Sequence, residues 1–122
     1  MKYVGQELAE KILITILKNP EMHDQSEWGL GDECGTTACV CGHAAIINGD
    51  AEYRPEDDEK LKLKLKDLSR YVNWEEYGKQ ALGLKENDSY RLFYKCSNAQ
   101  AVEALAYLAR GEKIDWSKVS NI

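Results

Sequence analysis

Residues 36–48, which read TTACVCGHAAIIN, decide the fold of this chain. Almost every side chain in this stretch is small or apolar. A helix that is apolar on most sides is typical of the core of a helical protein. Gly49 follows directly, as glycine often does at the C-terminal end of a helix. We therefore expect a central helix over residues 36–48, buried on most of its surface.

A second helix is predicted upstream, near the start of the chain. Apolar residues recur there at helical spacing over about four turns, and Pro20 follows where the helix is expected to end. The face predicted to point into the core consists of Leu8, Ala9, Ile12, Leu13, Ile16 and Leu17.

Signals for helix starts and helix ends divide the second half of the chain. Two capping boxes, Asn73-Trp74-Glu75-Glu76 and Ser97-Asn98-Ala99-Gln100, mark the starts of two helices. Gly83 and Gly111 stand where these two helices are expected to end. Between them, residues 88–94 are expected to supply one or two further turns.

Two other segments have a less regular pattern. Pro55 and the acids after it fit the first turn of a helix that continues to Val72. The alternation of Leu and Lys in residues 61–65 would also suit a strand, so both interpretations stay open. In the tail, Ile114 and Trp116 are expected to dock onto the core.

Length and composition indicate one ordinary globular domain. The chain has 122 residues, of which 43% are hydrophobic and 30% charged, and this suits a single core. Together with the helical patterns, this predicts an all-α fold: a single compact, bundle-like domain over residues 1–122, with about five helices around the buried central one. The longest apolar run near the start, residues 12–17, is far shorter than a membrane span of about 20 residues. We therefore expect a cytoplasmic protein without membrane contact.

The net charge is −5, and the acidity is local, because residues 50–59 hold six acids and one Arg. Binding to nucleic-acid phosphates relies on Lys and Arg, so a domain without a basic stripe is not expected to bind nucleic acid directly. The acidic run is typical of a solvated helix start, although it could instead imitate a phosphate backbone, as in a DNA-mimic inhibitor. For want of basic neighbours, we expect core or interface positions rather than a stacking platform for Trp74, Tyr77, Tyr90, Phe93 and Tyr94.

Residues 34–43 stand out because they combine three cysteines, a Gly-Thr-Thr sequence and a histidine. In a purely structural interpretation, Thr36 or Thr37 caps the central helix and the cysteines pack as small apolar side chains. In a functional interpretation, the same helix N-terminus presents backbone N–H groups, hydroxyls and partial positive charge to an anion such as a nucleotide phosphate. The ligand-binding residues predicted on this basis are Trp28, Cys34, Gly35, Thr36, Thr37, Cys39 and His43.

Two other chemistries stay open for this segment. Cys39 and His43 are four residues apart, which is a common spacing of zinc ligands on one helix face. Further ligands could come from Cys34, Cys41, Cys96 or His23. Alternatively, a thiolate at Cys34 or Cys39 could act as a nucleophile with His43 as its base. No Cys-x-x-Cys pair and no oxyanion site can be identified, so we assign no metal, cofactor or catalytic residue. His23 lies in a predicted loop, and we expect it at the surface.

Several short motifs are spread along the chain: Trp28-Gly29, Cys34-Gly35-Thr36-x-x-Cys39-x-x-Gly42-x-Ala44, Leu82-Gly83-Leu84, Leu92-Phe93, Gly111 and Asp115-Trp116. In these motifs the chain resembles a group of small helical proteins from bacteria and their phages that have no settled activity. The resemblance implies a phage or prophage context, in which small acidic proteins bind host defence proteins or their nucleotide signals. We therefore expect a non-enzymatic binding module for a small anionic, nucleotide-like ligand or a host defence protein, and a homodimer remains open.

Overall fold

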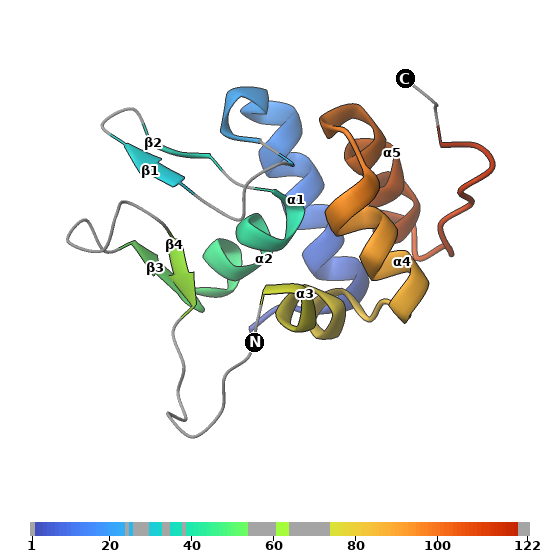
Figure 1. Ribbon diagram of the computed structural model, residues 1–122, viewed down its shortest axis with the longest axis horizontal. Coiled ribbons are helices and arrows are strands. Elements are labelled where there is room, and N and C mark those ends of the chain that lie inside the picture. The colour runs from blue at the N-terminus through green and yellow to red at the C-terminus, as the bar shows by residue number, and fades with distance from the viewer. Residues whose placement is uncertain are drawn as a thin grey trace.

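Helix α2 (Val40–Asn48) is the buried central element that the sequence predicts (Figure 1). The structure is a computed structural model that describes residues 2–23, 25, 30–32, 35–37, 39–53, 61–63 and 74–119. Four apolar residues of α2 are completely buried: Val40, Cys41, Ala44 and Ala45. Gly49 ends the helix with a φ of +70°, a conformation that favours glycine. Helices α1 (Gly5–Lys18) and α3 (Trp74–Leu82) pack against α2.

Helix α1 (Gly5–Lys18) packs against α2, α3 (Trp74–Leu82) and α5 (Asn98–Ala109), so it is surrounded by the other long helices. A single 3-10 turn, η1 (Pro20–Met22), follows it. The buried residues of α1 are Leu8, Ala9, Ile12 and Ile16, as predicted. The prediction for Leu17 is wrong, since this side chain is 62% exposed. Apolar residues extend over more of the α1 surface than its neighbouring helices cover.

The predicted helices of the second half are confirmed. Helix α3 ends at Gly83, which has a φ of +66°. Helix α4 (Glu86–Tyr90) continues directly into a π-helix, η3 (Arg91–Lys95). The capping box of α5 is complete, because Ser97 and Gln100 each accept the other's backbone N–H. The other predicted capping box begins at residue 73, which lies outside the described residues.

The tail docks onto the bundle, as predicted. Ile114 is 4% exposed and belongs to the core. Trp116 packs against this core and donates its indole N–H to Oδ1 of Asp88 in α4 at 2.8 Å. The last described residues therefore close over the α4 side of the bundle.

Two short antiparallel hairpins lie on the side of the bundle away from α4 and α5 (Figure 1). In the first, β1 (Leu30–Asp32) pairs with β2 (Gly35–Thr37). In the second, β3 (Ala51–Tyr53) pairs with β4 (Leu61–Leu63), so the helix predicted for residues 55–72 is wrong at β4 and the strand alternative is confirmed there. The rest of that predicted helix lies outside the described residues.

The predicted all-α class is thus confirmed for the bundle, which has five α-helices within the described part of the chain. The hairpins add short extended segments beside it, and Ala51 of β3 packs against the core. None of the described helices combines the length and apolar character needed to cross a membrane.

Candidate functional site

The start of α2 differs from the predicted one. Gly35–Thr37 form strand β2, so neither threonine caps the helix. Helix α2 begins at Val40 with Cys39 as its N-cap, and the Cys39 side chain makes no capping bond. The Val40 N–H instead donates to Oε1 of Gln25 at 3.2 Å. A side chain 15 residues upstream therefore supplies the cap that was expected from a threonine.

Gln25 is the centre of a polar cluster, which we call the Gln25 cluster and which consists of the buried residues His23, Gln25 and His43 together with Asn98, whose side chain lies nearer the surface. The Gln25 side chain donates from Nε2 to the carbonyl oxygen of Leu92 in η3 at 2.6 Å. Its backbone N–H donates to Oδ1 of Asn98, the first residue of α5, at 2.8 Å. The cluster therefore ties the start of α2 to η3 and to the start of α5. Sequence reasoning missed it, because its partners are 15, 67 and 73 residues apart.

Both histidines belong to this cluster, so the prediction that His23 lies at the surface is wrong: it is 6% exposed. The two rings meet edge to face, with centroids 6.4 Å apart. His43 Nε2 lies 2.7 Å from the carbonyl oxygen of Met22, which can only accept, so this nitrogen carries a hydrogen. His23 Nε2 lies 2.9 Å from Oε1 of Gln25. The orientation of this amide is set by the bond from its nitrogen to Leu92, so the atom that faces His23 is an oxygen, which accepts, and His23 Nε2 also donates. In each ring the Nε2 atom is occupied within the fold.

The thiol and zinc interpretations find no complete set of groups among the described residues. Cys39 and His43 are 1% and 2% exposed, and residues 28 and 34 lie outside the described part. Burial, reinforced by the neighbouring Cys39, raises the pKa of the Cys41 thiol well above its usual value. The Cys41 thiol donates to the carbonyl oxygen of Trp74 at 2.8 Å and stays protonated. No group of three or more His, Cys, Asp or Glu side chains within the described ranges is placed to hold a metal ion.

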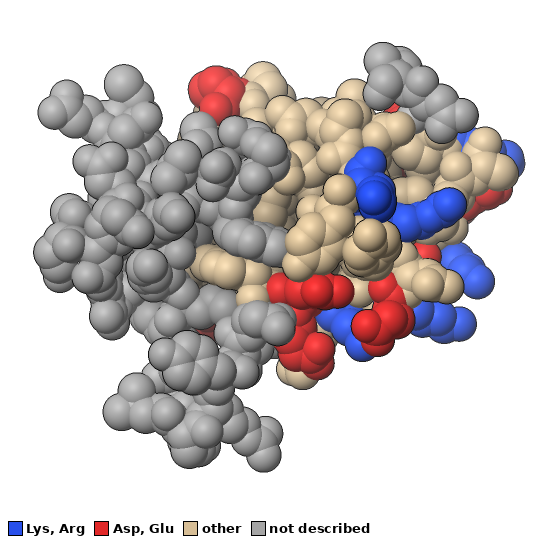
Figure 2. Space-filling view, viewed as in Figure 1, with Lys and Arg blue, Asp and Glu red and all other residues tan. Residues whose placement is uncertain are grey.

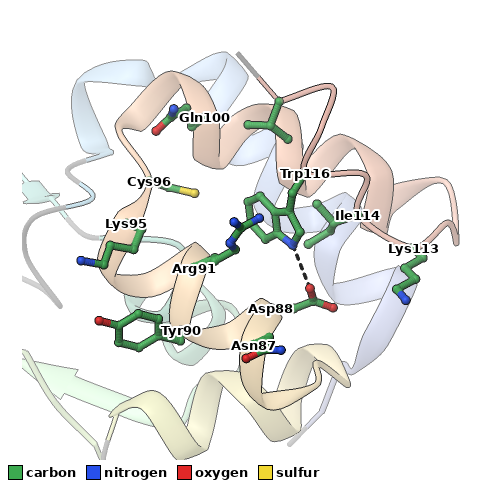
Figure 3. A pocket seen from close by; sticks show the side chains of 11 residues that line it. Asn87, Asp88, Tyr90, Arg91, Lys95, Cys96, Gln100, Lys113, Ile114 and Trp116 are labelled. Carbon is green, nitrogen blue, oxygen red and sulfur yellow. Dashed lines mark hydrogen bonds between the residues drawn. The ribbon is translucent and has the colours of Figure 1, made fainter. Parts of the chain in front are cut away.

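A different part of the chain forms an open pocket of about 810 Å³ between α4, η3, the start of α5 and the tail (Figure 3). Its lining residues are Asn87, Asp88, Tyr90, Arg91, Lys95, Cys96, Gln100, Lys113, Ile114, Trp116 and Val119. Three of these are cations, Arg91, Lys95 and Lys113, and one is an acid, Asp88. Of the predicted site residues that the structure describes, none lines this pocket.

The three pocket cations form no ion pair with a described carboxylate, whereas three other surface cations do: Lys79, Arg110 and Lys118. The Arg91 guanidinium lies over the Trp116 ring, with Cζ 5.4 Å from the ring centroid. The Lys95 ammonium lies over the Tyr90 ring at 5.7 Å. On the described surface in Figure 2, Lys and Arg side chains gather on the side that carries α4, α5 and the tail. The pocket is therefore a local basic site on an acidic chain.

The sequence did carry one signal for this pocket. Arg91 and Lys95 alternate with Tyr90 and Tyr94, and both tyrosines are about half exposed, at 49% and 50%. The prediction that these aromatic residues lack basic neighbours is therefore wrong for the η3 region. Among the other aromatic residues, Tyr77 and Phe93 are buried as expected, and Trp74 is partly buried.

Cys96 also lines the pocket and is partly buried. Burial raises the pKa of its thiol to about 11, although the charge of Arg91 acts in the opposite direction. It therefore contributes a neutral thiol to the pocket wall at physiological pH.

Comparison of the chain with protein families, with curated proteins and with solved structures finds no match.

Proposed function

We propose that this domain is a non-enzymatic binding module for a small anionic, nucleotide-like ligand, and that the ligand occupies the pocket beside η3. The observation that carries the proposal is the gathering of Arg91, Lys95 and Lys113 around one pocket without a described carboxylate partner. The chain as a whole has a net charge of −5 and repels anions. A local excess of cations is the feature that an anion site in such a protein requires.

The other groups in the pocket suit a nucleotide-like ligand. The volume of about 810 Å³ is within the range of small-molecule sites. A guanidinium can donate two parallel hydrogen bonds to a phosphate, and ammonium groups add compact positive charges. The Asn87 amide can donate to and accept from hydroxyls or base edges, and the aromatic rings of Tyr90 and Trp116 offer apolar surface.

The backbone of η3 also supports a binding role. π-Helices are rare and are found frequently at functional sites. Arg91 and Lys95 are the first and last residues of η3, so this irregular turn places both cations at the pocket. The Leu92 carbonyl inside the turn accepts from Gln25, which is buried behind it. A turn fixed from inside the protein lowers the cost of ordering the site when a ligand binds.

The proposal can be tested by titrating the protein with inorganic pyrophosphate and with nucleoside monophosphates in low salt, using isothermal calorimetry. An uncharged nucleoside serves as the ligand control. We expect Arg91→Gln and Lys113→Gln each to weaken pyrophosphate binding roughly tenfold, because each removes a charge-assisted contact. Lys79→Gln is the matched control, since Lys79 pairs with Glu86 outside the pocket. Binding should also weaken as the salt concentration rises.

Two outcomes would overturn the proposal. If Arg91→Gln bound normally while a Thr36→Ala, Thr37→Val double variant lost binding, the ligand would sit at the segment first predicted, residues 34–43. If the parent protein bound none of these anions at millimolar concentration, a protein partner such as a host defence protein would be the better interpretation.

A further inference from the structure

The C-terminal segment, residues 111–119, forms one wall of the pocket. Ile114 and Val119 anchor it in the core, at 4% and 8% exposed. No helix or strand is formed within this segment. Its position therefore depends on anchoring side chains. Trp116 lies between Ile114 and Val119 in the sequence and is the third anchor, because its indole bonds to Asp88.

Trp116 is held by two side chains of the opposite wall (Figure 3). Asp88 of α4 accepts the indole N–H at 2.8 Å, at the edge of the ring. Arg91 of η3 lies over the ring face, with its Cζ 5.4 Å from the centroid. Within the described ranges the guanidinium makes no ion pair and no hydrogen bond, so its contact with the indole is what orders it.

This contact leaves the binding groups of Arg91 available. The attraction between a guanidinium and an aromatic ring is a cation–π contact, and within the described residues no carboxylate or carbonyl oxygen accepts from the five N–H donors of Arg91. Contact with the ring therefore does not consume the donors that bind a phosphate. It restricts the rotamers of a long side chain before the ligand arrives, and this reduces the entropy lost on binding.

Asp88 has an unexpected place in an anion site, because it is the one acid among the lining residues that the structure describes. Its negative charge opposes the binding of an anion. Its hydrogen bond to Trp116 gives it a different role, which is to hold the indole under Arg91. The charge of Asp88 and its hydrogen bond therefore have opposite effects on the site, and substitutions can separate them.

We infer that Trp116 is a positioning residue for Arg91, so that docking of the C-terminal segment and binding of the anion strengthen each other. This inference rests on the function proposed above. Because coupling between two binding events is reciprocal, a bound anion must stabilise the docked segment as much as the docked segment stabilises the bound anion.

The test uses the full chain with inorganic pyrophosphate as the probe, and it measures pyrophosphate affinity and the amide hydrogen exchange of residues 111–119. In the parent protein, pyrophosphate should slow this exchange. Trp116→Leu should weaken pyrophosphate binding roughly three- to tenfold and remove the slowing, because Arg91 is no longer ordered. The control is Lys118→Gln in the same segment, whose exposed side chain lies outside the pocket lining and should change neither quantity.

The variants Asp88→Asn and Asp88→Ala remove the same charge but differ in the hydrogen bond. The Asn amide oxygen can still accept from the indole, so Asp88→Asn should keep the slowing of exchange and bind pyrophosphate at least as tightly as the parent. Asp88→Ala should lose the slowing and bind more weakly than Asp88→Asn. Both changes are made near the surface, so they keep the test valid even if the tryptophan variant folds poorly.

The outcomes separate the two claims. If pyrophosphate binding depends on Arg91 but is the same in the parent and in Trp116→Leu, the positioning role is wrong and the proposed function stands. Equal affinities of Asp88→Asn and Asp88→Ala would also overturn the positioning role, because only the charge would then matter. If the parent shows no Arg91-dependent binding, the proposed function itself fails.

Discussion

Gly78 in the middle of α3 is the position at which one added methyl group should do most harm. A Cβ atom there would lie 2.5 Å from Cζ of Phe93 and 2.8 Å from Sγ of Cys41. Carbon atoms in contact prefer separations of roughly 3.5–4.0 Å, so at least one neighbour would have to move by about 1 Å. Phe93 is 4% exposed and Cys41 is fully buried, and neither can move into solvent.

We expect Gly78→Ala to destabilise the domain by about 2 kcal/mol. In an exposed helix interior this substitution would add about 1 kcal/mol of stability, because alanine favours the helix. Overpacking a close-packed core costs roughly 1–3 kcal/mol, and a displacement of this size belongs at the upper end. For a domain of this length, the net loss should lower the midpoint of thermal unfolding by roughly 8 °C.

Urea unfolding followed by circular dichroism would measure this change. The helix-propensity contribution can be calibrated in the same helix by comparing Gln80→Ala with Gln80→Gly, since both lose the bond from Gln80 to Glu76. In a double-mutant cycle, Phe93→Leu should reverse part of the loss caused by Gly78→Ala, because leucine has no atoms at the clashing ring positions. A Gly78→Ala protein as stable as the parent would refute the reasoning.

Three further predictions concern the Gln25 cluster, the start of α5 and the pocket thiol. Gln25→Leu leaves the buried N–H of Val40 and the carbonyl of Leu92 without their partner, so the free energy of unfolding in urea should fall by about 2–4 kcal/mol. A decrease below about 1 kcal/mol would argue against the capping role. Ser97→Ala should cost about 1 kcal/mol and Ser97→Gly only a few tenths, a ranking that thermal unfolding can check and that a reversed order would contradict. Burial raises the pKa of the Cys96 thiol from 9.0 to about 11, so at pH 8 the thiol should be alkylated roughly 100-fold more slowly in the folded than in the unfolded protein. Peptide mass spectrometry can measure both rates, and equal rates would contradict the burial. The same shift means that the Cys96 contribution to stability is present below about pH 9 and lost as the pH rises through about 11.

The sequence predicted the helical elements well because the interactions that define them are local. The capping box at Ser97 and Gln100 spans three residues, and the structure contains both of its hydrogen bonds. Gly49 and Gly83 were expected to end helices, and each has a positive φ at a helix end. The apolar spacing of α1 predicted the buried residues Leu8, Ala9, Ile12 and Ile16. These signals depend on neighbours within one or two turns, which a sequence displays directly.

The predicted site was harder to obtain, because the contacts that form it join residues far apart in the sequence. Glycine, threonine and a following apolar run are equally compatible with a capped helix and with a strand that precedes one. The pairing of Gly35–Thr37 with β1 decided in favour of the strand, and the distant amide of Gln25 then capped α2 at Val40. The burial of His23 follows from the same contacts, since nothing in its immediate sequence requires a buried ring.

The sequence by itself determined that this is a helical bundle around an apolar central helix, with capped helices and a local run of acidic residues, because periodicity, caps and composition are properties of neighbouring residues. Only the tertiary structure decided where cations and aromatic rings converge. Arg91 and Lys95 come from η3, whereas Lys113 and Trp116 come from a segment that crosses back to α4 after α5. Their meeting depends on where the last residues dock, and docking is set by the packing of the whole bundle.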